Sequence, residues 1–421
     1  MNFATTCFQK RLRKYSINQS LRKRDIMHST DIVIVAAKRT PIGAFLGGLS
    51  TLPAPKLGSI AHIAALEAAQ LLAADIDEVI SGCVLQAGIG QAPARQAAIL
   101  AGIPYAAGAT TINKMCGSGM KAVMIAHDLI QTGAANIVLA SGMESMSLAP
   151  YLLSKARTGY RLGHGELKDH MFLDGLEDAY EPGKLMGCFA DETAKDYHLD
   201  RAQQDAFAIE SMQRALAAQA SGAFQQEIAP VTVTTRTGET LVTQDENPDE
   251  KKISKVSQLK PAFHPEGTIT AASSSSIADG AASLILMRME EAIQRGLIPL
   301  ARIVAQSTHA QEPHTFATAP ISAIKKVIER AGWQPQQVDL YEINEAFAAV
   351  TLAAIKALEL DPKKVNIHGG ACALGHPIGA SGARILVTLI HALQAQHKSR
   401  GVAALCIGGG EATAMAIELL V

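Results

Sequence analysis

The sequence predicts an α/β fold in which a mostly parallel sheet is covered by helices on both faces. From residue 31 onward, short runs rich in β-branched residues alternate with longer Ala-rich segments at helical spacing, and one strand–helix unit recurs late in the chain. Hydrophobic residues make up 48% of the 421 residues and charged residues 18%, with 34 glycines. This composition excludes a disordered chain and is typical of helices packed closely on sheets.

The length suggests two or three domains of ~150 residues. A formal net charge of −1 gives no general basic field, so we expect neither a nucleic-acid nor a membrane partner. No uninterrupted apolar run reaches the ~18 residues of a membrane span. The six cysteines contain no CxxC pair. We therefore expect free thiols in a reducing compartment, with neither a disulfide framework nor a metal site.

Residues 1–26 differ from the rest, with seven basic residues against one acid, Asp25, a local charge of +6. Such a leader is typical of a mitochondrial transit peptide. The interpretation that we prefer is a start codon placed too early, with Met27 as the initiator. On that basis we expect a cytoplasmic protein; the transit-peptide interpretation places it in the mitochondrial matrix.

The elements of the first half follow in order. We expect strands at 31–37, 77–88 and 135–145, and helices at 57–74, 93–102 and 118–133. Residues 148–275 are richer in charge, contain the polar run 244–255, and are interpreted as a lobe inserted into the α/β body. The expected organisation is a leader at 1–30, a first half at 31–147, the insertion at 148–275, a return at 276–297 and a second half at 298–421.

An internal repeat links the two halves. Residues 115–121 and 378–384 each carry small residues that open a helix, and a strand follows 20 residues (Cys116 to Asn136) or 22 residues (Gly379 to Gly401) later. Two copies of one unit would place equivalent helix N-termini about a pseudo-twofold axis. Gly-Ser-Gly before a helix is also common wherever helices pack closely, but the matched order and spacing favour a true repeat.

Four segments could perform chemistry. Cys116 precedes a predicted helix, whose positive end favours a thiolate and would lower its pKa. His376 lies before the equivalent helix and could take the proton of Cys116; a surface histidine is the alternative. Cys406 ends a buried strand before three glycines, whose N–H groups could stabilise an oxyanion; a small core residue is the alternative. Asn344 is either the N-cap of a helix or an amide that holds a water.

The glycines at 408–410 lack the G-x-G-x-x-G spacing of a dinucleotide site, so NAD binding is rejected.

Taken together, INKMCGSGMKAV, YEINEAFAAV, GGACALGHPIGASGAR and LCIGGGEATA, in this order, resemble the thiolase family. The resemblance runs from about residue 31 to the C-terminus. The Asn344-Glu345-Ala346-Phe347 form is similar to the acetoacetyl-CoA type. The resemblance implies a five-layered αβαβα fold with an inserted loop domain.

The resemblance also implies the roles of the site residues. Cys116 would be acylated, and His376 would activate it and bind the thioester oxygen together with a water held by Asn344. Cys406 would remove the α-proton of the second acetyl-CoA, and the N–H groups of Cys116 and Gly408 would form the second oxyanion hole. One thiol then holds the acyl group and the other handles the carbon acid.

By the same resemblance, coenzyme A would contact residues that differ in part from the family pattern. These are Leu185, Met186, Phe263, Ser275 and Phe316. Lys251, Lys252 or Lys255 would replace the usual Arg near the nucleotide.

The implied activity is the reversible condensation of two acetyl-CoA to acetoacetyl-CoA, in a homodimer or homotetramer, without a cofactor beyond the coenzyme A thioesters. A broader 3-ketoacyl-CoA thiolase is the alternative within the family. A decarboxylating ketoacyl synthase would need His or Asn in place of Cys406. A CoA-ester carrier would lack the nucleophile or the base, and neither is missing.

Overall fold

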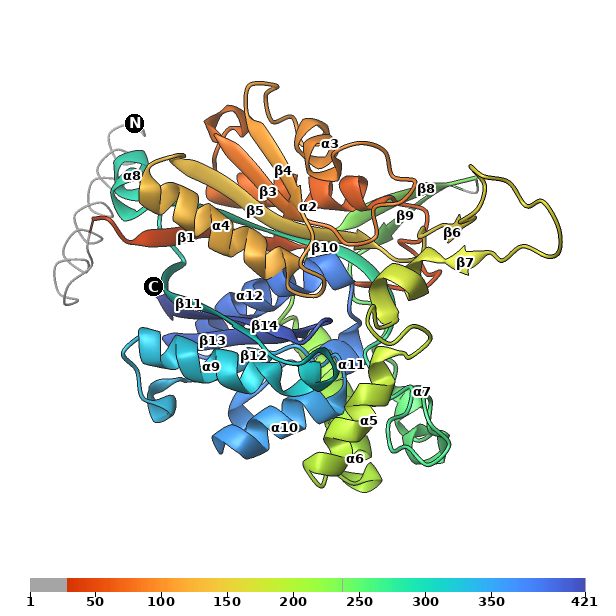
Figure 1. Cartoon of the computed structure of the whole chain (residues 1–421). Helices are drawn as coiled ribbons and strands as arrows, with labels where there is room; N and C mark the ends of the chain where they lie inside the picture. The colour runs from red at the N-terminus through yellow and green to blue at the C-terminus, as the bar shows by residue number, and fades with distance from the viewer. Residues whose placement is uncertain (1–28, 237, 421) are drawn as a thin grey trace.

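The computed structural model describes residues 29–236 and 238–420. The basic leader 1–26 lies outside the described residues. Five layers stack through the molecule in the order helix, sheet, helix, sheet, helix (Figure 1). The expected αβαβα arrangement is therefore confirmed.

The first sheet and its outer helices come from the N-terminal half and the strand that returns to it. The elements are β1 (Ile32–Arg39), β2 (Gly43–Ala44), α2 (Ala54–Ala69), β3 (Glu78–Gly82), α3 (Pro93–Leu100), β4 (Gly108–Ile112), α4 (Ser118–Thr132), β5 (Ile137–Ser145), β10 (Ala278–Arg288) and α8 (Met289–Arg295). Helices α2 and α3 cover the outer face, and α4 covers the inner one.

The second sheet belongs to the C-terminal half. Its elements are β11 (Ala301–Ala310), α9 (Ala319–Arg330), β12 (Leu340–Ile343), α10 (Ala348–Leu358), α11 (Ala371–Leu374), α12 (Ile378–Ala395), β13 (Arg400–Ile407) and β14 (Glu411–Leu419). Helix α9 packs on the outer face against β11, β13 and β14, and α12 packs on the inner face.

The expectation of a mostly parallel sheet is wrong. Only β3–β4, β3–β5 and β12–β13 pair in parallel, whereas β1–β10, β10–β5, β11–β14 and β13–β14 are antiparallel. Direct hairpin and return connections supply the antiparallel strands, and only the strand–helix–strand units are parallel. The edges of the two sheets also pair, Val33 opposite Arg302 and Ile34 opposite Ala301, so the strands form one continuous path.

The repeat places α4 and α12 side by side in the central layer. A Cβ added to Gly119 would lie 2.6 Å from the Ala383 nitrogen, and one added to Gly382 would lie 2.3 Å from the Met120 nitrogen. Glycine at these two equivalent positions therefore lets the helices touch through their backbones. This contact brings the helix beginnings that follow Cys116 and His376 together.

The chain between β5 and β10 forms a lobe on one side of the layers (Figure 1). Its elements are β6 (Tyr151–Leu152), β7 (Lys168–Asp169), α5 (Met186–Asp196), α6 (Arg201–Ser221), β8 (Val231–Thr235), β9 (Gly238–Val242) and α7 (Glu250–Ile253). Buried Arg39 on β1 fixes the lobe, because its guanidinium binds Glu227 at 2.5 Å and Asp245 at 2.6 Å.

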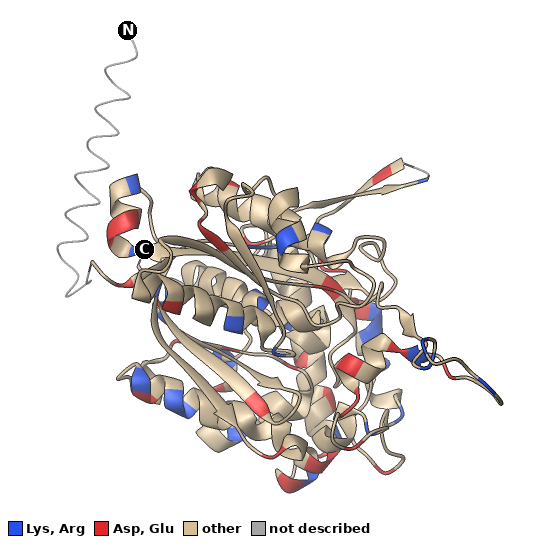
Figure 2. Ribbon diagram, turned by 45° about the horizontal axis from the view of Figure 1, so that its top comes forward, with Lys and Arg blue, Asp and Glu red and all other residues tan. Residues whose placement is uncertain are grey.

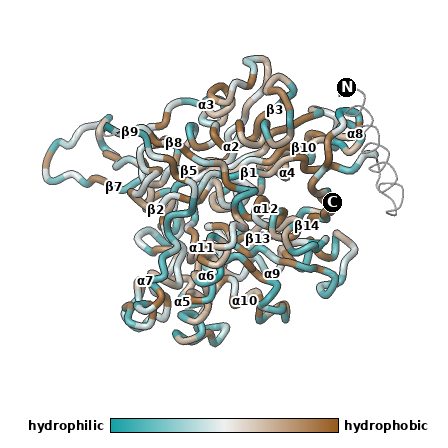
Figure 3. Tube along the Cα trace, turned by 180° about the vertical axis from the view of Figure 1, so that it is seen from behind, coloured by the Kyte–Doolittle hydropathy of each residue, from teal (hydrophilic) through white to brown (hydrophobic). Residues whose placement is uncertain are grey.

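Charged residues lie mainly on outer helices and loops, and they are few on the central strands and helices (Figure 2). Hydrophobic segments of the trace follow the strands and the middle helices (Figure 3). Of the described helices, α12 alone is long and apolar enough to cross a membrane, and 83% of it is buried inside the protein. Its position between two sheets accounts for its apolar character.

Candidate active site

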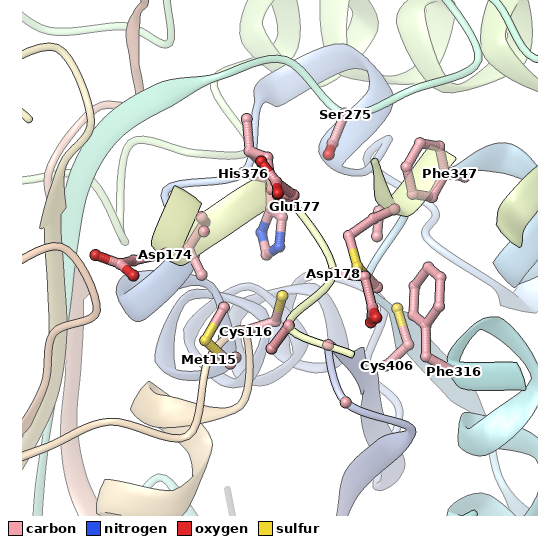
Figure 4. Close-up of a pocket in the computed structure, with 18 of the residues that line it drawn as sticks. Met115, Cys116, Asp174, Glu177, Asp178, Ser275, Phe316, Phe347, His376 and Cys406 are labelled. Carbon is pink, nitrogen blue, oxygen red and sulfur yellow. The ribbon is translucent and has the colours of Figure 1, made fainter. Parts of the chain in front are cut away.

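A pocket of about 330 Å³ opens where the two halves meet the lobe. Cys116, His376, Cys406 and Gly408 all line it, although they come from segments up to 292 residues apart, from Cys116 to Gly408. In Figure 4 the imidazole of His376 is directed toward the Cys116 sulfur, and the Cys406 sulfur faces the same space. The structure thus brings together four of the five residues that the sequence singled out for catalysis.

The loop before α4 aims Cys116 into this pocket. Met115 has a positive φ of 47°, which is rare for a side chain of its size. The Ser118 hydroxyl holds this conformation, because it accepts from the Lys114 N–H at 2.8 Å and donates to the Met115 carbonyl at 2.7 Å. A Cβ at Gly117 would lie 2.4 Å from Ile407 Cδ1. The loop is therefore in direct contact with β13, the strand that carries Cys406.

The expected lowering of the Cys116 pKa is wrong. Burial raises the pKa of Cys116 to about 11, even though the N–H groups of Gly408 and of Cys116 itself hydrogen-bond the sulfur and act in the opposite direction. Desolvation outweighs these N–H groups, and the charge of Glu144 acts in the same direction as desolvation. Cys116 is therefore a neutral thiol at rest and needs a base for its proton.

His376 lines the same pocket and is the candidate base. It is 7% exposed, which excludes the surface-histidine alternative. Its Nδ1 lies 2.5 Å from the Ser381 hydroxyl, and its Nε2 is buried without a hydrogen-bond partner among the described residues. Burial, aided by the charge of Arg384, lowers the pKa of His376 to about 3. The ring is neutral at physiological pH and can accept a proton at Nε2.

Asn344 is not the N-cap of a helix. It follows β12, and Phe347 caps α10 three residues later. The Asn344 side chain is fully buried behind His376, with Nδ2 3.5 Å from Nδ1 of the ring, and Arg384 Nη2 lies 3.5 Å from its Oδ1. Asn344 is absent from the pocket lining, so the structure places it in contact with His376 and not on the open wall.

Cys406 ends the buried strand β13, and the glycines 408–410 form the turn into β14. Burial raises the pKa of Cys406 well above its usual value, and nearby Cys116 adds to the effect. A Cβ at Gly408 would meet only Met186 Cε at 3.8 Å. The Gly408 N–H hydrogen-bonds the Cys116 sulfur, so a backbone donor lies next to the candidate nucleophile.

The residues expected to contact coenzyme A divide into two groups. Met186, Ser275 and Phe316 line the pocket. Leu185 and Phe263 do not. Phe263 packs edge-on against Phe347, with ring centroids 5.8 Å apart, and covers Gly187, where a Cβ would lie 2.3 Å from its ring. Phe263 thus supports the wall from behind.

Sequence reasoning missed one whole wall of the pocket, residues 173–180. Asp178 accepts from the N–H groups of Tyr180 and Glu181, and Glu177 accepts from that of Gly183, so these carboxylates brace the segment. Phe347 is a second missed residue. Phe347 is the last residue of the Asn344-Glu345-Ala346-Phe347 form, which was a usable signal, whereas the charged segment 173–180 resembles a solvated loop in sequence.

A second pocket of about 290 Å³ lies beyond the serine run, lined by Ser276, Lys252 and Lys255 among others. Ser275 faces the first pocket and Ser276 the second. Of the lysines considered for the nucleotide, Lys251 is not in this lining. In the described part of the chain, no three His, Cys, Asp or Glu side chains are grouped to hold a metal ion.

Comparison with known proteins agrees with this geometry. The thiolase N-terminal domain family matches residues 32–290, and the thiolase C-terminal domain family matches residues 297–419. The chain belongs to the thiolase family.

Curated thiolase relatives match along nearly their whole length. Acetyl-CoA acetyltransferase 2 of Arabidopsis thaliana is 50% identical over 393 residues, 93% of this chain and 97% of the relative. Acetyl-CoA acetyltransferase of Escherichia coli is 49% identical, over 92% of this chain and 99% of the relative. A crystal structure of the Bacillus anthracis acetyl-CoA acetyltransferase superposes with a TM-score of 0.91 at 41% identity, covering 93% of this chain and 99% of that one.

Proposed function

We propose that this thiolase condenses two molecules of acetyl-CoA reversibly to acetoacetyl-CoA and free coenzyme A, through an acetyl group held on Cys116. The observation that carries the proposal is the meeting of two thiols and one neutral imidazole, Cys116, Cys406 and His376, in a single pocket. The names of the relatives, acetyl-CoA acetyltransferases, support the same activity.

In the first half-reaction, Cys116 attacks the thioester carbonyl while its proton passes to Nε2 of His376. The buried pocket raises the thiol pKa, so transfer accompanies attack and no free thiolate forms beforehand. The departing coenzyme A thiolate takes its proton from Cys406. Acetyl-Cys116, an imidazolium at His376 and a thiolate at Cys406 remain, and the charges balance.

In the second half-reaction, the Cys406 thiolate removes a proton from the methyl carbon of a new acetyl-CoA. Nε2–H of His376 stabilises the enolate oxygen, and the N–H groups of Cys116 and Gly408 stabilise the oxyanion on the acetyl group. The enolate attacks the acetyl carbonyl, and the Cys116 sulfur leaves with the proton of His376. Cys116, Cys406 and His376 thereby return to their starting protonation states.

The shape of the pocket favours a short acyl group. Phe316 and Phe347 stand with ring centroids 6.4 Å apart, and Met186 fills the space beside Gly408. The pantetheine arm would run past Ser275, and Lys252 and Lys255 in the second pocket offer charge to the phosphates. Coenzyme A is a substrate in this scheme, and no separate cofactor is required. A cytoplasmic homodimer or homotetramer remains part of the proposal.

Acetyl transfer from acetyl-CoA tests the proposal directly. Mass spectrometry of the digested protein should locate the acetyl group on Cys116, and Cys116→Ala should abolish it. Cys188→Ala is a matched control, because Cys188 is a half-buried thiol absent from the lining of the pocket, and should keep the label. Label on Cys406, or on no cysteine, would overturn the assignment.

The second candidate is a broader 3-ketoacyl-CoA thiolase. Thiolysis with free coenzyme A across 3-ketoacyl-CoA chain lengths separates the two. If the aromatic pair limits the pocket, the rate should fall steeply beyond acetoacetyl-CoA. Sustained rates with long chains would favour the broader enzyme.

A further inference from the structure

The Ser381 hydroxyl lies 2.5 Å from Nδ1 of His376, inside the first turn of α12. Both side chains are buried, and Ser381 has no exposed surface at all. The same hydroxyl lies 3.0 Å from the Pro377 carbonyl oxygen, with geometry suited to donation. One hydroxyl thus bridges the imidazole and a backbone acceptor.

The single hydrogen of the Ser381 hydroxyl decides between two hydrogen-bond arrangements. The hydroxyl has a single hydrogen, so if it donates to Pro377 it must accept from Nδ1–H of His376. In the opposite arrangement the hydroxyl donates to Nδ1, and the ring hydrogen sits on Nε2. That hydrogen would have no acceptor among the described residues, since Nε2 has no hydrogen-bond partner there, and the Pro377 carbonyl would lose its donation from the hydroxyl.

The internal repeat supplies an independent comparison. Ser118 occupies the position in α4 that Ser381 occupies in α12. Its hydroxyl donates to the Met115 carbonyl of its own loop and accepts from the Lys114 N–H. At Ser381 the carbonyl acceptor is that of Pro377, four residues earlier and not three, and the corresponding arrangement is donation to this carbonyl and acceptance from the imidazole.

A second group approaches Nδ1. Arg384 Nη2 lies beside Oδ1 of Asn344 and so turns the Nδ2 hydrogens toward His376. An amide N–H can only donate, so this contact taken alone would favour a lone pair on Nδ1. At 3.5 Å it is much longer than the 2.5 Å contact with the Ser381 hydroxyl, and the hydroxyl therefore decides the tautomer.

We propose that Ser381 is a positioning residue that fixes His376 in the tautomer protonated at Nδ1, so that the lone pair of Nε2 faces the Cys116 thiol. The inference rests on the proposed function for its kinetic consequence, but the tautomer itself is a property of the resting protein. When Cys116 attacks, its proton moves to Nε2, and Nδ1 keeps its hydrogen on Ser381. The second tautomer has no lone pair to offer at Nε2 and cannot accept that proton.

Nuclear magnetic resonance of ¹⁵N-histidine-labelled wild-type protein decides the tautomer, with His376→Asn used to assign the ring. The Nε2 shift should be that of a nitrogen with a lone pair, and Nδ1 that of one carrying hydrogen, between pH 6 and 8. The reverse pattern in the wild-type protein overturns the proposal without any Ser381 variant.

Ser381→Ala supplies the kinetic test. Single-turnover acetylation of Cys116 should slow by roughly 10²-fold, the scale of a positioned proton transfer, while the KM for acetyl-CoA stays within about threefold. The Nε2 signal should shift toward the protonated form. Ser283→Ala is the matched control, since it removes a fully buried hydroxyl that has no hydrogen-bond partner among the described residues, and both readouts should stay at wild-type values.

Acetylation of Ser381→Ala at the wild-type rate would contradict the positioning role. Absence of acetylation in the wild-type protein would instead refute the proposed function. The two failures are therefore distinguishable.

Discussion

Lys114 and Glu411 form an ion pair that joins the two halves of the fold across 297 residues of sequence. Lys114 lies in the loop that carries Cys116, and Glu411 opens β14 directly after the turn that carries Gly408. Glu411 is held on both sides by strand pairing, to Ile407 and to Ala310. The pair therefore ties together the loop that carries Cys116 and the turn that carries Gly408, whose N–H groups are the proposed oxyanion donors.

Breaking the ion pair of Lys114 and Glu411 should slow the acetylation of Cys116 more than it lowers the free energy of unfolding. The side chains are 23% and 37% exposed, so a double-mutant cycle of Lys114→Met and Glu411→Gln should give a coupling of only ~0.2–1 kcal/mol in unfolding. Small displacements of catalytic donors cost more in rate. We expect each single variant to acetylate up to about tenfold more slowly, and Lys114→Glu with Glu411→Lys to recover most of the loss. Wild-type rates in both single variants would refute this role.

Cys406→Ser should separate the two half-reactions. Acetylation of Cys116 should persist, because the substitution leaves Cys116 and His376 intact and solvent can supply the proton of the leaving thiolate. Condensation, and deuterium exchange at the acetyl methyl group, should each fall by ~10²–10⁴-fold, since a hydroxyl is far less acidic than a thiol. Exchange at the wild-type level would place the base elsewhere, with His376 as the first candidate.

Adding a methyl group to either glycine at the contact between α4 and α12 should destabilise the protein. At Gly119 and Gly382 the added Cβ would meet backbone nitrogen atoms, which cannot move aside as a flexible side chain can. Gly119→Ala and Gly382→Ala should each lower the free energy of unfolding by ~1–3 kcal/mol or more, and should also slow acetylation because the helix beginnings separate.

Gly133→Ala is the matched control for this packing. Gly133 ends the same helix α4 with a positive φ of 76°, and nothing lies within 4 Å of its added Cβ. The backbone strain should cost ~1–2 kcal/mol with no change in acetylation rate. Equal losses of rate in all three variants would mean that general destabilisation, and not the helix contact, governs the site. Urea denaturation and single-turnover assays supply the two measurements.

His376 should make the protein less stable in mild acid. Its pKa is about 3 when folded against about 6.5 when unfolded, so the unfolded state binds more protons between these values and stability falls as pH drops through that window. Lowering the pH from 7 to 5 should reduce the free energy of unfolding by about 2 kcal/mol through this group. His376→Asn should remove that share of the pH dependence in urea denaturation.

The comparison must be made between variant and wild type, because other groups act in the opposite sense. Burial raises the pKa of Glu144 to about 7 and that of Glu342 to about 8. The folded state therefore retains their protons above pH 4.5, and their contribution is lost as pH rises toward the folded values. Identical pH slopes for His376→Asn and the wild-type protein would show that His376 is not buried in its neutral form.

Several features could be predicted from sequence because they depend on local pattern. The strand at 31–37 and the helix after Cys116 follow from periodicity and from small residues at a helix start, and both are present as β1 and α4. The motifs around Cys116, His376 and Cys406 could be read in order along the chain. The repeat also indicated the pairing of α4 with α12, because equivalent glycines occur at equivalent places.

Other features depend on which distant segments come into contact. Strand direction could not be read from hydrophobic runs, since a strand buried on both faces looks alike in parallel and antiparallel pairing. Asn344 was ambiguous in sequence, and only the approach of Arg384 and His376 made it part of the site.

The sequence by itself determined the family of this protein, the order of its elements and which two thiols, Cys116 and Cys406, are the candidates for the chemistry, since these are properties of residue type and spacing. The tertiary structure alone decided the ionisation of those thiols, the wall at 173–180 and the link between Lys114 and Glu411. The physical reason is desolvation. Burial by remote segments raises the pKa of Cys116 against the pull of its own helix, and no local pattern records how deeply a residue will be buried.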